Sequence, residues 1–140
     1  MTSIWSGVSP LTINFTATQG AALTFTTATS RVDLIGSNIL RIQSRLSFTS
    51  AGTPGQVLLI APLVGGVTFH ADNISIPVGV YNLNDASTTL KYVGAAMWSA
   101  SNAFNCQGNL TVAGTAWGTD PALTIAIGDT INFDITLVIN

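Results

Sequence analysis

Hydrophobic and polar residues alternate with a period of two along most of this chain. In the run 40–48, Leu40, Ile42, Leu46 and Phe48 share one face, and Arg41 and Arg45 lie on the other. The run 130–139 alternates as regularly, with an apolar residue at each odd position from 131 to 139. Strict alternation is typical of a β-strand with one buried face and one solvated face. We therefore expect two half-buried strands here.

Shorter apolar runs, separated by turn-forming residues, fill the rest of the chain. They lie at residues 11–16, 23–26, 56–60, 67–70, 74–81, 88–98 and 109–117. The turn residues Gly128 and Asp129 predict a hairpin between residues 122–127 and 130–139. The segment 95–104 is compatible with a strand or a helical turn. Strands at such intervals predict an antiparallel β-sandwich of jelly-roll type with about 8–10 short strands.

Composition supports an all-β domain and divides the chain into two parts. Thr, Val and Ile, which favour strands, are abundant, whereas Glu is absent and Lys occurs once. Residues 11–140 are long enough for one sandwich domain, and residues 1–10 form an N-terminal arm ahead of it. In the arm, Ile4 and Trp5 are candidates for docking on a partner. In the alternative interpretation, Trp5 caps one end of its own sandwich.

The chain carries unusually little charge. Charged residues make up 7% of it, against about 25% in an ordinary soluble domain. Such a surface is expected to be covered by copies of the chain or by another protein, or to consist of uncharged hydroxyl and amide groups.

The net charge of -2 argues against a nucleic-acid partner, which needs clustered Lys and Arg. No apolar run is long enough to span a membrane, and no signal peptide is recognisable, so we expect synthesis in the cytoplasm of the cell that makes the chain.

Residues capable of chemistry are few and scattered. His70 and Asp72 share a strand face, but no nucleophile motif accompanies them. The Asn and Asp residues at 82–85 and Asp120 offer oxygen ligands for calcium, yet they are also ordinary turn residues. Cys106, the single cysteine, has no basic neighbour and is expected to be inert. We therefore predict no catalytic residues, no cofactor and no metal site.

The aromatic residues allow one further kind of site. Trp98 and Trp117 fall within strand patterns, which favours packing in the core or at a subunit interface. The alternative is that they stack on a glycan, because carbohydrate recognition uses aromatic faces among uncharged polar groups.

The chain as a whole resembles the small jelly-roll proteins of tailed bacteriophages. The resemblance rests on its charge-poor Thr, Ser, Asn and Gly content, on the segment 128–133 (Gly-Asp-Thr-Ile-Asn-Phe), and on a last strand that runs to the C-terminus. It implies a homotrimer bound to a larger particle. The first hypothesis is a capsid decoration (cement) protein on the outer surface of a virion, in contact with the major capsid protein. The second is the head of a receptor-binding fibre or tail tip that recognises host glycans.

Overall fold

The structure is a computed structural model that describes residues 12–88, 90–107 and 124–140. The predicted arm 1–10, with Ile4 and Trp5, lies outside the described residues. The same is true of the predicted strand 109–117, of Trp117 and of Asp120.

Nine strands and one short 3-10 helix make up the described regular structure. They are β1 (Ile13–Gln19), β2 (Ala21–Leu23), β3 (Phe25–Ile35), β4 (Ile39–Phe48), β5 (Leu58–Val64), η1 (Ala71–Asn73), β6 (Pro77–Asn84), β7 (Lys91–Trp98), β8 (Phe104–Gln107) and β9 (Thr130–Val138). All strand pairs are antiparallel, in the order β2-β1-β5-β8-β7-β6-β9-β4-β3. The predicted all-β antiparallel fold is confirmed.

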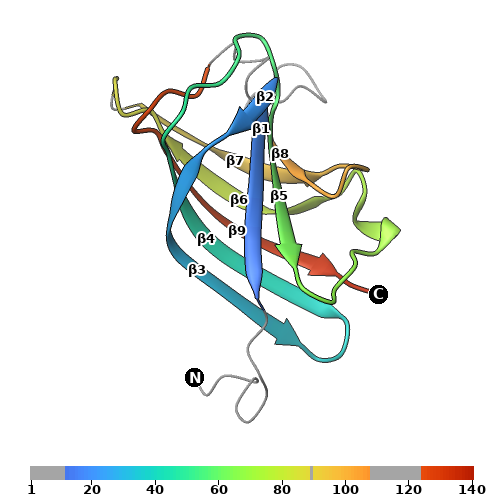
Figure 1. The fold of residues 1–140 in the computed structure, drawn as a ribbon. Coiled ribbons are helices and arrows are strands. Elements are labelled where there is room, and N and C mark those ends of the chain that lie inside the picture. The colour runs from blue at the N-terminus through green and yellow to red at the C-terminus, as the bar shows by residue number, and fades with distance from the viewer. Residues whose placement is uncertain (1–11, 89, 108–123) are drawn as a thin grey trace.

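The sheet curls over on itself, so that its two end strands are consecutive in the chain. β2 and β3 are joined by Thr24 alone. Thr24 is held by its N–H, which donates to Ser50 Oγ over 2.8 Å, and by its carbonyl, which accepts from Thr49 N–H over 2.9 Å. Figure 1 shows β1 and β5 in front of β4, β6 and β9. The two layers of the fold therefore belong to one nearly closed sheet. The jelly-roll prediction did not specify this order of strands.

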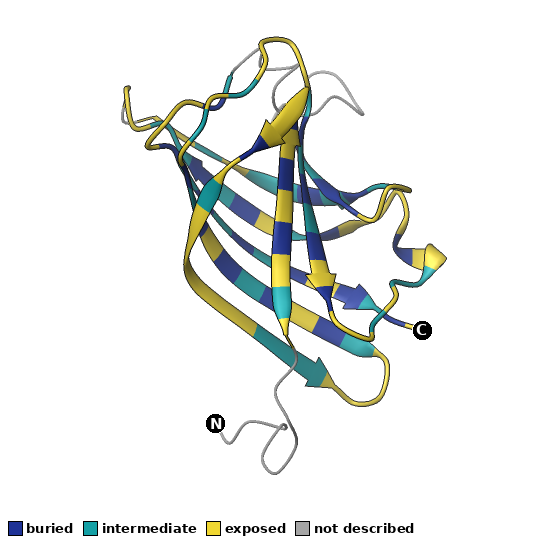
Figure 2. Ribbon diagram, viewed as in Figure 1, coloured by how far each residue is buried: buried dark blue, intermediate teal, exposed yellow. Residues whose placement is uncertain are grey.

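The two strands with the clearest alternation fold as predicted. On β4, Leu40, Ile42, Leu46 and Phe48 are buried, and Arg41 and Arg45 are exposed. On β9 and just beyond it, every odd residue from Ile131 to Ile139 is buried. Figure 2 shows the same alternation along β1. Ser44 is the exception on the inner face of β4, and its hydroxyl donates to the Thr29 carbonyl over 2.7 Å.

The predicted hairpin between residues 122–127 and 130–139 is wrong in its described part. Both edges of β9 are already occupied, one by β4 and the other by β6. The turn itself forms, because Asp129 N–H donates to the Ala126 carbonyl. Residues 124–127 instead approach β4 and the loop after it, where Gly128 N–H donates to the Phe48 carbonyl.

Three other local expectations change. Residues 67–70 form no strand, and only Phe69 makes an isolated bridge, to Ile139. The segment 95–104 contains no helix, since it holds the end of β7 and the beginning of β8. β3 continues to Ile35, although only 23–26 was predicted, and residues 26–31 are exposed on both faces. Pairing with β4, rather than an apolar face of its own, makes this stretch a strand.

An aromatic cluster joins the two layers of the core. Phe133 on β9 meets Phe15 on β1 edge-on, with ring centroids 5.5 Å apart, and Phe104 on β8 at 4.9 Å. These rings come from three strands that are far apart in the chain and on opposite layers of the curled sheet. Aromatic pairs in such arrangements each contribute about 0.5–1.5 kcal/mol beyond the burial of their area.

Buried polar side chains hold the loops against the sheet. Asn73, 5% exposed, donates to the carbonyls of His70 and Val138 and accepts from Val138 N–H over 3.0 Å. Gln19, 0% exposed, accepts from Ile125 N–H over 2.8 Å and donates to the Gln56 carbonyl. Gly52 lies against the Gln19 amide so closely that a Cβ there would overlap Oε1. These amides satisfy backbone groups that no strand reaches.

Replacing Asn73 by Ala should destabilise the fold by about 2 kcal/mol, because the Val138 N–H loses its acceptor and the Val138 carbonyl keeps only the His70 N–H as a donor. Chemical denaturation of the purified chain measures this loss. Asn14→Ala is the matched control, since Asn14 is exposed on β1, and its free energy of unfolding should stay close to that of the wild type. Equal stability of the two variants would contradict the role assigned to Asn73.

Candidate functional site

The candidate site is the outer face of the sheet, defined as the outward-pointing residues of β3, β4, β9, β6, β7 and β8. Register places these residues in rows across the strands. One row contains Arg31, Gln43, Asp134, Val80 and Ala95. The next row contains Thr29, Arg45, Asn132, Asn82 and Val93. Residues far apart in sequence thus become neighbours because the strands pair in this order.

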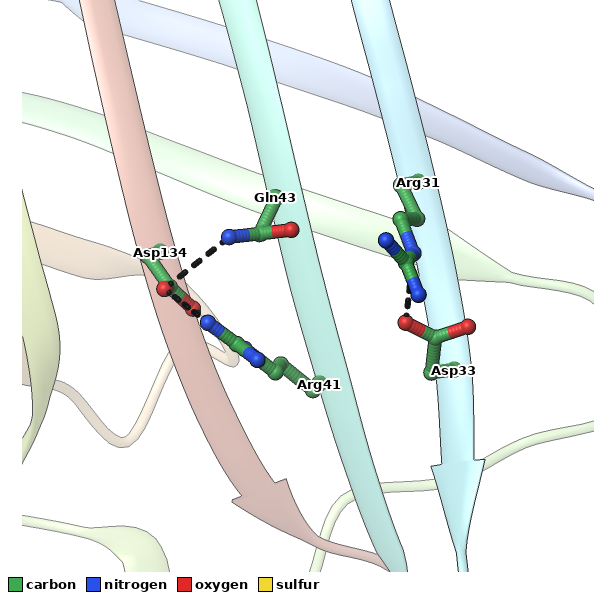
Figure 3. A network of polar contacts seen from close by, with 5 residues as sticks. All are labelled: Arg31, Asp33, Arg41, Gln43 and Asp134. Atoms are coloured by element: carbon green, nitrogen blue, oxygen red, sulfur yellow. Dashed lines mark hydrogen bonds and ion pairs between the residues drawn. The ribbon is translucent and has the colours of Figure 1, made fainter. Parts of the chain in front are cut away.

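Charged residues gather at one end of these rows, on β3, β4 and β9. Arg41 binds Asp134 in a bidentate way, with Nε to Oδ1 at 3.0 Å and Nη2 to Oδ2 at 2.6 Å. Gln43 Nε2 donates to the same Oδ2 over 3.1 Å. On β3, Arg31 Nε pairs with Asp33 Oδ2 at 2.7 Å. Figure 3 shows the Gln43 amide between these two ion pairs, with its nitrogen directed at Asp134.

The ion pair fixes the charge state of Asp134. The hydrogen bond from Arg41 is the largest influence that lowers the pKa of the Asp134 carboxyl, and the bond from Gln43 lowers it further. The same contact raises the pKa of the Arg41 guanidinium. Three hydrogen bonds hold the carboxylate, so it is an anchored structural group rather than a free base.

Two shallow hollows lie between the two rows. One, of about 320 Å³, is lined by Thr29, Ser30, Arg31, Gln43, Ser44, Asn132 and Phe133. The other, of about 300 Å³, is lined by Gln43, Val80, Tyr81, Asn82, Asn132, Phe133 and Asp134. They share Gln43, Asn132 and Phe133, and therefore adjoin over β4 and β9.

The other end of the outer face, over β6, β7 and β8, is almost uncharged. Lys91 is the one charged residue in these three strands. Val80 and Val93 point outward with 62% and 65% of their surface exposed, and Ala95 lies opposite Val80. Amides border these aliphatic side chains, with Asn82 on β6 and Asn105 and Gln107 on β8. We call Val80, Val93 and Ala95 the aliphatic patch.

Trp98 takes the core position that its strand pattern allowed. It is 1% exposed and packs edge-on against Phe69, with ring centroids 5.1 Å apart. That burial leaves no ring face for a sugar or a second subunit, which corrects the interface and glycan-stacking alternatives for this residue. The other sequence-predicted site residues, Ile4, Trp5 and Trp117, lie outside the described residues.

The residues singled out for chemistry have local structural roles. His70 Nδ1 accepts from the Asp72 N–H over 3.1 Å at the start of η1 and lies 3.4 Å from the Asp72 carboxylate. Asp85 accepts from the N–H and hydroxyl of Ser87, which makes a turn and lowers the pKa of its carboxyl. Cys106 is fully buried, and burial raises the pKa of its thiol. Within residues 12–88, 90–107 and 124–140, no three His, Cys, Asp or Glu side chains are grouped to hold a metal ion.

The network in Figure 3 was not predicted, although part of its signal is in the sequence. Alternation alone places Arg41 on the outer face of its strand and Asp134 on the outer face of another. The pairing of these two strands, which lie 93 residues apart at this contact, is what brings the charges together.

No protein-family model, curated protein or solved structure matches this chain. The part of the chain that the structure describes contains no helix of the length and apolar character needed to cross a bilayer.

The Arg41–Asp134 pair should make stability depend on pH in acid. Folding lowers the pKa of the Asp134 carboxyl. The ion pair therefore contributes fully to the free energy of unfolding above the carboxyl pKa of the unfolded chain, about 3.9. This contribution is lost as the pH falls through the pKa of the carboxyl in the folded chain. Asp134→Asn should therefore flatten the decline of the melting temperature below about pH 4. Thermal unfolding measured across this range tests the expectation.

Arg45→Gln serves as the control for this experiment, because Arg45 lies on the same face of β4 and the described structure records no ion pair for it. The melting temperature of Arg45→Gln should fall with decreasing pH as steeply as that of the wild type. If Asp134→Asn and Arg45→Gln give the same profile as the wild type, the ion pair contributes nothing to the acid dependence.

Proposed function

We propose that this chain is a structural virion protein: a decoration (cement) protein that assembles as a homotrimer on the outer surface of a tailed-bacteriophage capsid. The observation that carries the proposal is the nearly uncharged outer face over β6, β7 and β8, where Val80 and Val93 are largely exposed. Interface centres are depleted in charged residues, whereas ordinary protein surfaces are not.

Several features of the fold support a role in assembly. The antiparallel sheet is nearly closed and presents a broad face, and the charged groups at the other end of that face, Arg41 and Asp134, neutralise each other. A protein on the outside of a capsid also gains from a net charge of -2, because it has no attraction to packaged nucleic acid. The low charge is then explained by contact with protein.

In this proposal Val93 and Ala95, the β7 part of the aliphatic patch, pack against a neighbouring copy, and Val80 on β6 stays accessible at the rim of the interface. The N-terminal arm docks on the major capsid protein. Each arm contact is weak by itself. Three arms linked in one trimer bind with a much higher overall affinity, because the second and third contacts form at a high effective concentration.

A charge in the aliphatic patch should prevent the trimer from forming. Val93→Glu places a carboxylate in the proposed interface, where burying an unpaired charge costs several kcal/mol. Light scattering after size-exclusion chromatography should give the mass of three chains for the wild type and of one chain for Val93→Glu.

Thr16→Glu is the matched control, since Thr16 is exposed on β1 away from the patch, and this variant should remain a trimer. A wild-type monomer at micromolar concentration would overturn the proposed trimer. A Val93→Glu trimer would show that the interface lies elsewhere.

Deleting residues 1–9 should leave the oligomer intact and reduce its occupancy on capsids. The physical reason is that Ile4 and Trp5, the proposed docking residues, are lost from all three arms at once. Electron cryomicroscopy of particles from the virus that encodes the chain measures the occupancy. Undiminished decoration by the truncated protein contradicts the role of the arm, and a location on the tail contradicts the role in the capsid.

A further inference from the structure

The two hollows on the outer face adjoin across four strands, and together we call them the trough. The trough runs from Thr29 and Arg31 on β3, over Gln43 on β4 and Asn132 on β9, to Val80 and Asn82 on β6. Each hollow, about 320 and 300 Å³, lies at the lower end of the ~300–1,000 Å³ typical of small-molecule sites. The trough therefore offers space for a chain of small units rather than for one large ligand.

The side chains along the trough combine donors and acceptors without a strong net charge. Gln43, Asn82 and Asn132 each carry an amide, and Thr29 carries a hydroxyl. Asn82 Oδ1 is buried and has no hydrogen-bond partner among the described residues. Arg31 uses its Nε on Asp33, which leaves its other guanidinium N–H groups for a ligand.

The floor of the trough is fixed before any ligand arrives. Asp134 holds Gln43 through its amide nitrogen and is itself held by Arg41. The Gln43 amide is thereby oriented, and its Oε1 is directed away from Asp134 (Figure 3). A rigid polar surface of this kind loses little side-chain entropy on binding.

We propose that the trough binds a saccharide through its hydroxyl groups. Planar amides and a guanidinium can each donate to or accept from neighbouring hydroxyls of a sugar, and Val80 offers an aliphatic contact for its C–H groups. Three of the four strands that form the trough, β4, β9 and β6, are hydrogen-bonded on both sides, and the unpaired edge of β3 is the one away from β4. An extended peptide therefore finds no free edge within the trough. Val80 is the one exposed large aliphatic side chain in the lining, which is too little for a lipid chain.

The trough has no exposed aromatic ring on which a sugar could stack, and this limits its affinity for a single saccharide. Tyr81 and Phe133 line the trough, but both are buried with their rings on the core side. Single-site binding therefore depends on hydrogen bonds, each with a modest net contribution. Measurable binding is expected for glycans displayed at high density, where several copies of the chain engage together. This inference does not depend on the decoration role, since a monomer carries the complete trough.

A glycan array probed with the multivalent, labelled full-length chain provides the test. We expect reproducible binding to a defined set of glycans. The double variant Asn82→Leu, Asn132→Leu keeps the size of both side chains but removes their hydrogen bonds, and it should weaken binding at least tenfold. Circular dichroism and thermal unfolding establish that the variant is folded.

Asn14→Leu is the matched control, because Asn14 is an exposed amide on β1 that lines a separate hollow of about 400 Å³. If Asn14→Leu binds glycans as strongly as the wild type, the result supports binding in the trough. Loss of binding in Asn14→Leu, with binding kept by the double variant, places the sugar in that other hollow and overturns the proposal. An array without reproducible binding, confirmed by unchanged NMR shifts of Asn82 and Asn132 with millimolar free monosaccharides, overturns it as well.

Discussion

The packing of Phe133 against Phe15 and Phe104 is the contact on which the two-layered fold depends. A curled sheet keeps its shape only if side chains from opposite layers fill the space between them. Phe133 lies on β9, whose two edges are both paired, so the ring is held in place by β4 on one side and β6 on the other. The same strand presents Asn132 and Asp134 outward. Burial of Phe133 therefore also determines which polar groups reach the outer face.

Polar side chains complete the fold at the places where strand pairing ends. Asn73 pairs with Val138 at the end of β9, Gln19 with residue 125, and Asp129 accepts from the N–H groups of Ala86 and Ala126. A buried backbone group left without a partner costs about 1–3 kcal/mol, so a few well-placed amides and one carboxylate stabilise several loops. Asn73 and Gln19 bond the backbone without burying a charge, and Asp129 is the one of these three side chains that places a carboxylate in a buried position.

The sequence predicted the strands that have one apolar and one polar face, because a period of two is a local property. It did not predict the length of β3, whose residues 26–31 have no buried face and depend on β4. It also misassigned the partner of β9, since the turn at Gly128 favours a hairpin while the core favours insertion between β4 and β6. The Arg41–Asp134 pair and the trough beside it depend on the same long-range register. Local patterns determine which way a side chain points, but not which strand lies next to it.

The contact between Gln19 and Gly52 couples two distant positions of the chain. A side chain at position 52 would displace the Gln19 amide and leave the Ile125 N–H buried without its acceptor. A shorter residue at position 19 would leave the same N–H unpaired even with glycine at 52. Neither position can change alone without a loss of stability. Evolutionary change at positions 19 and 52 therefore requires compensating substitutions at both.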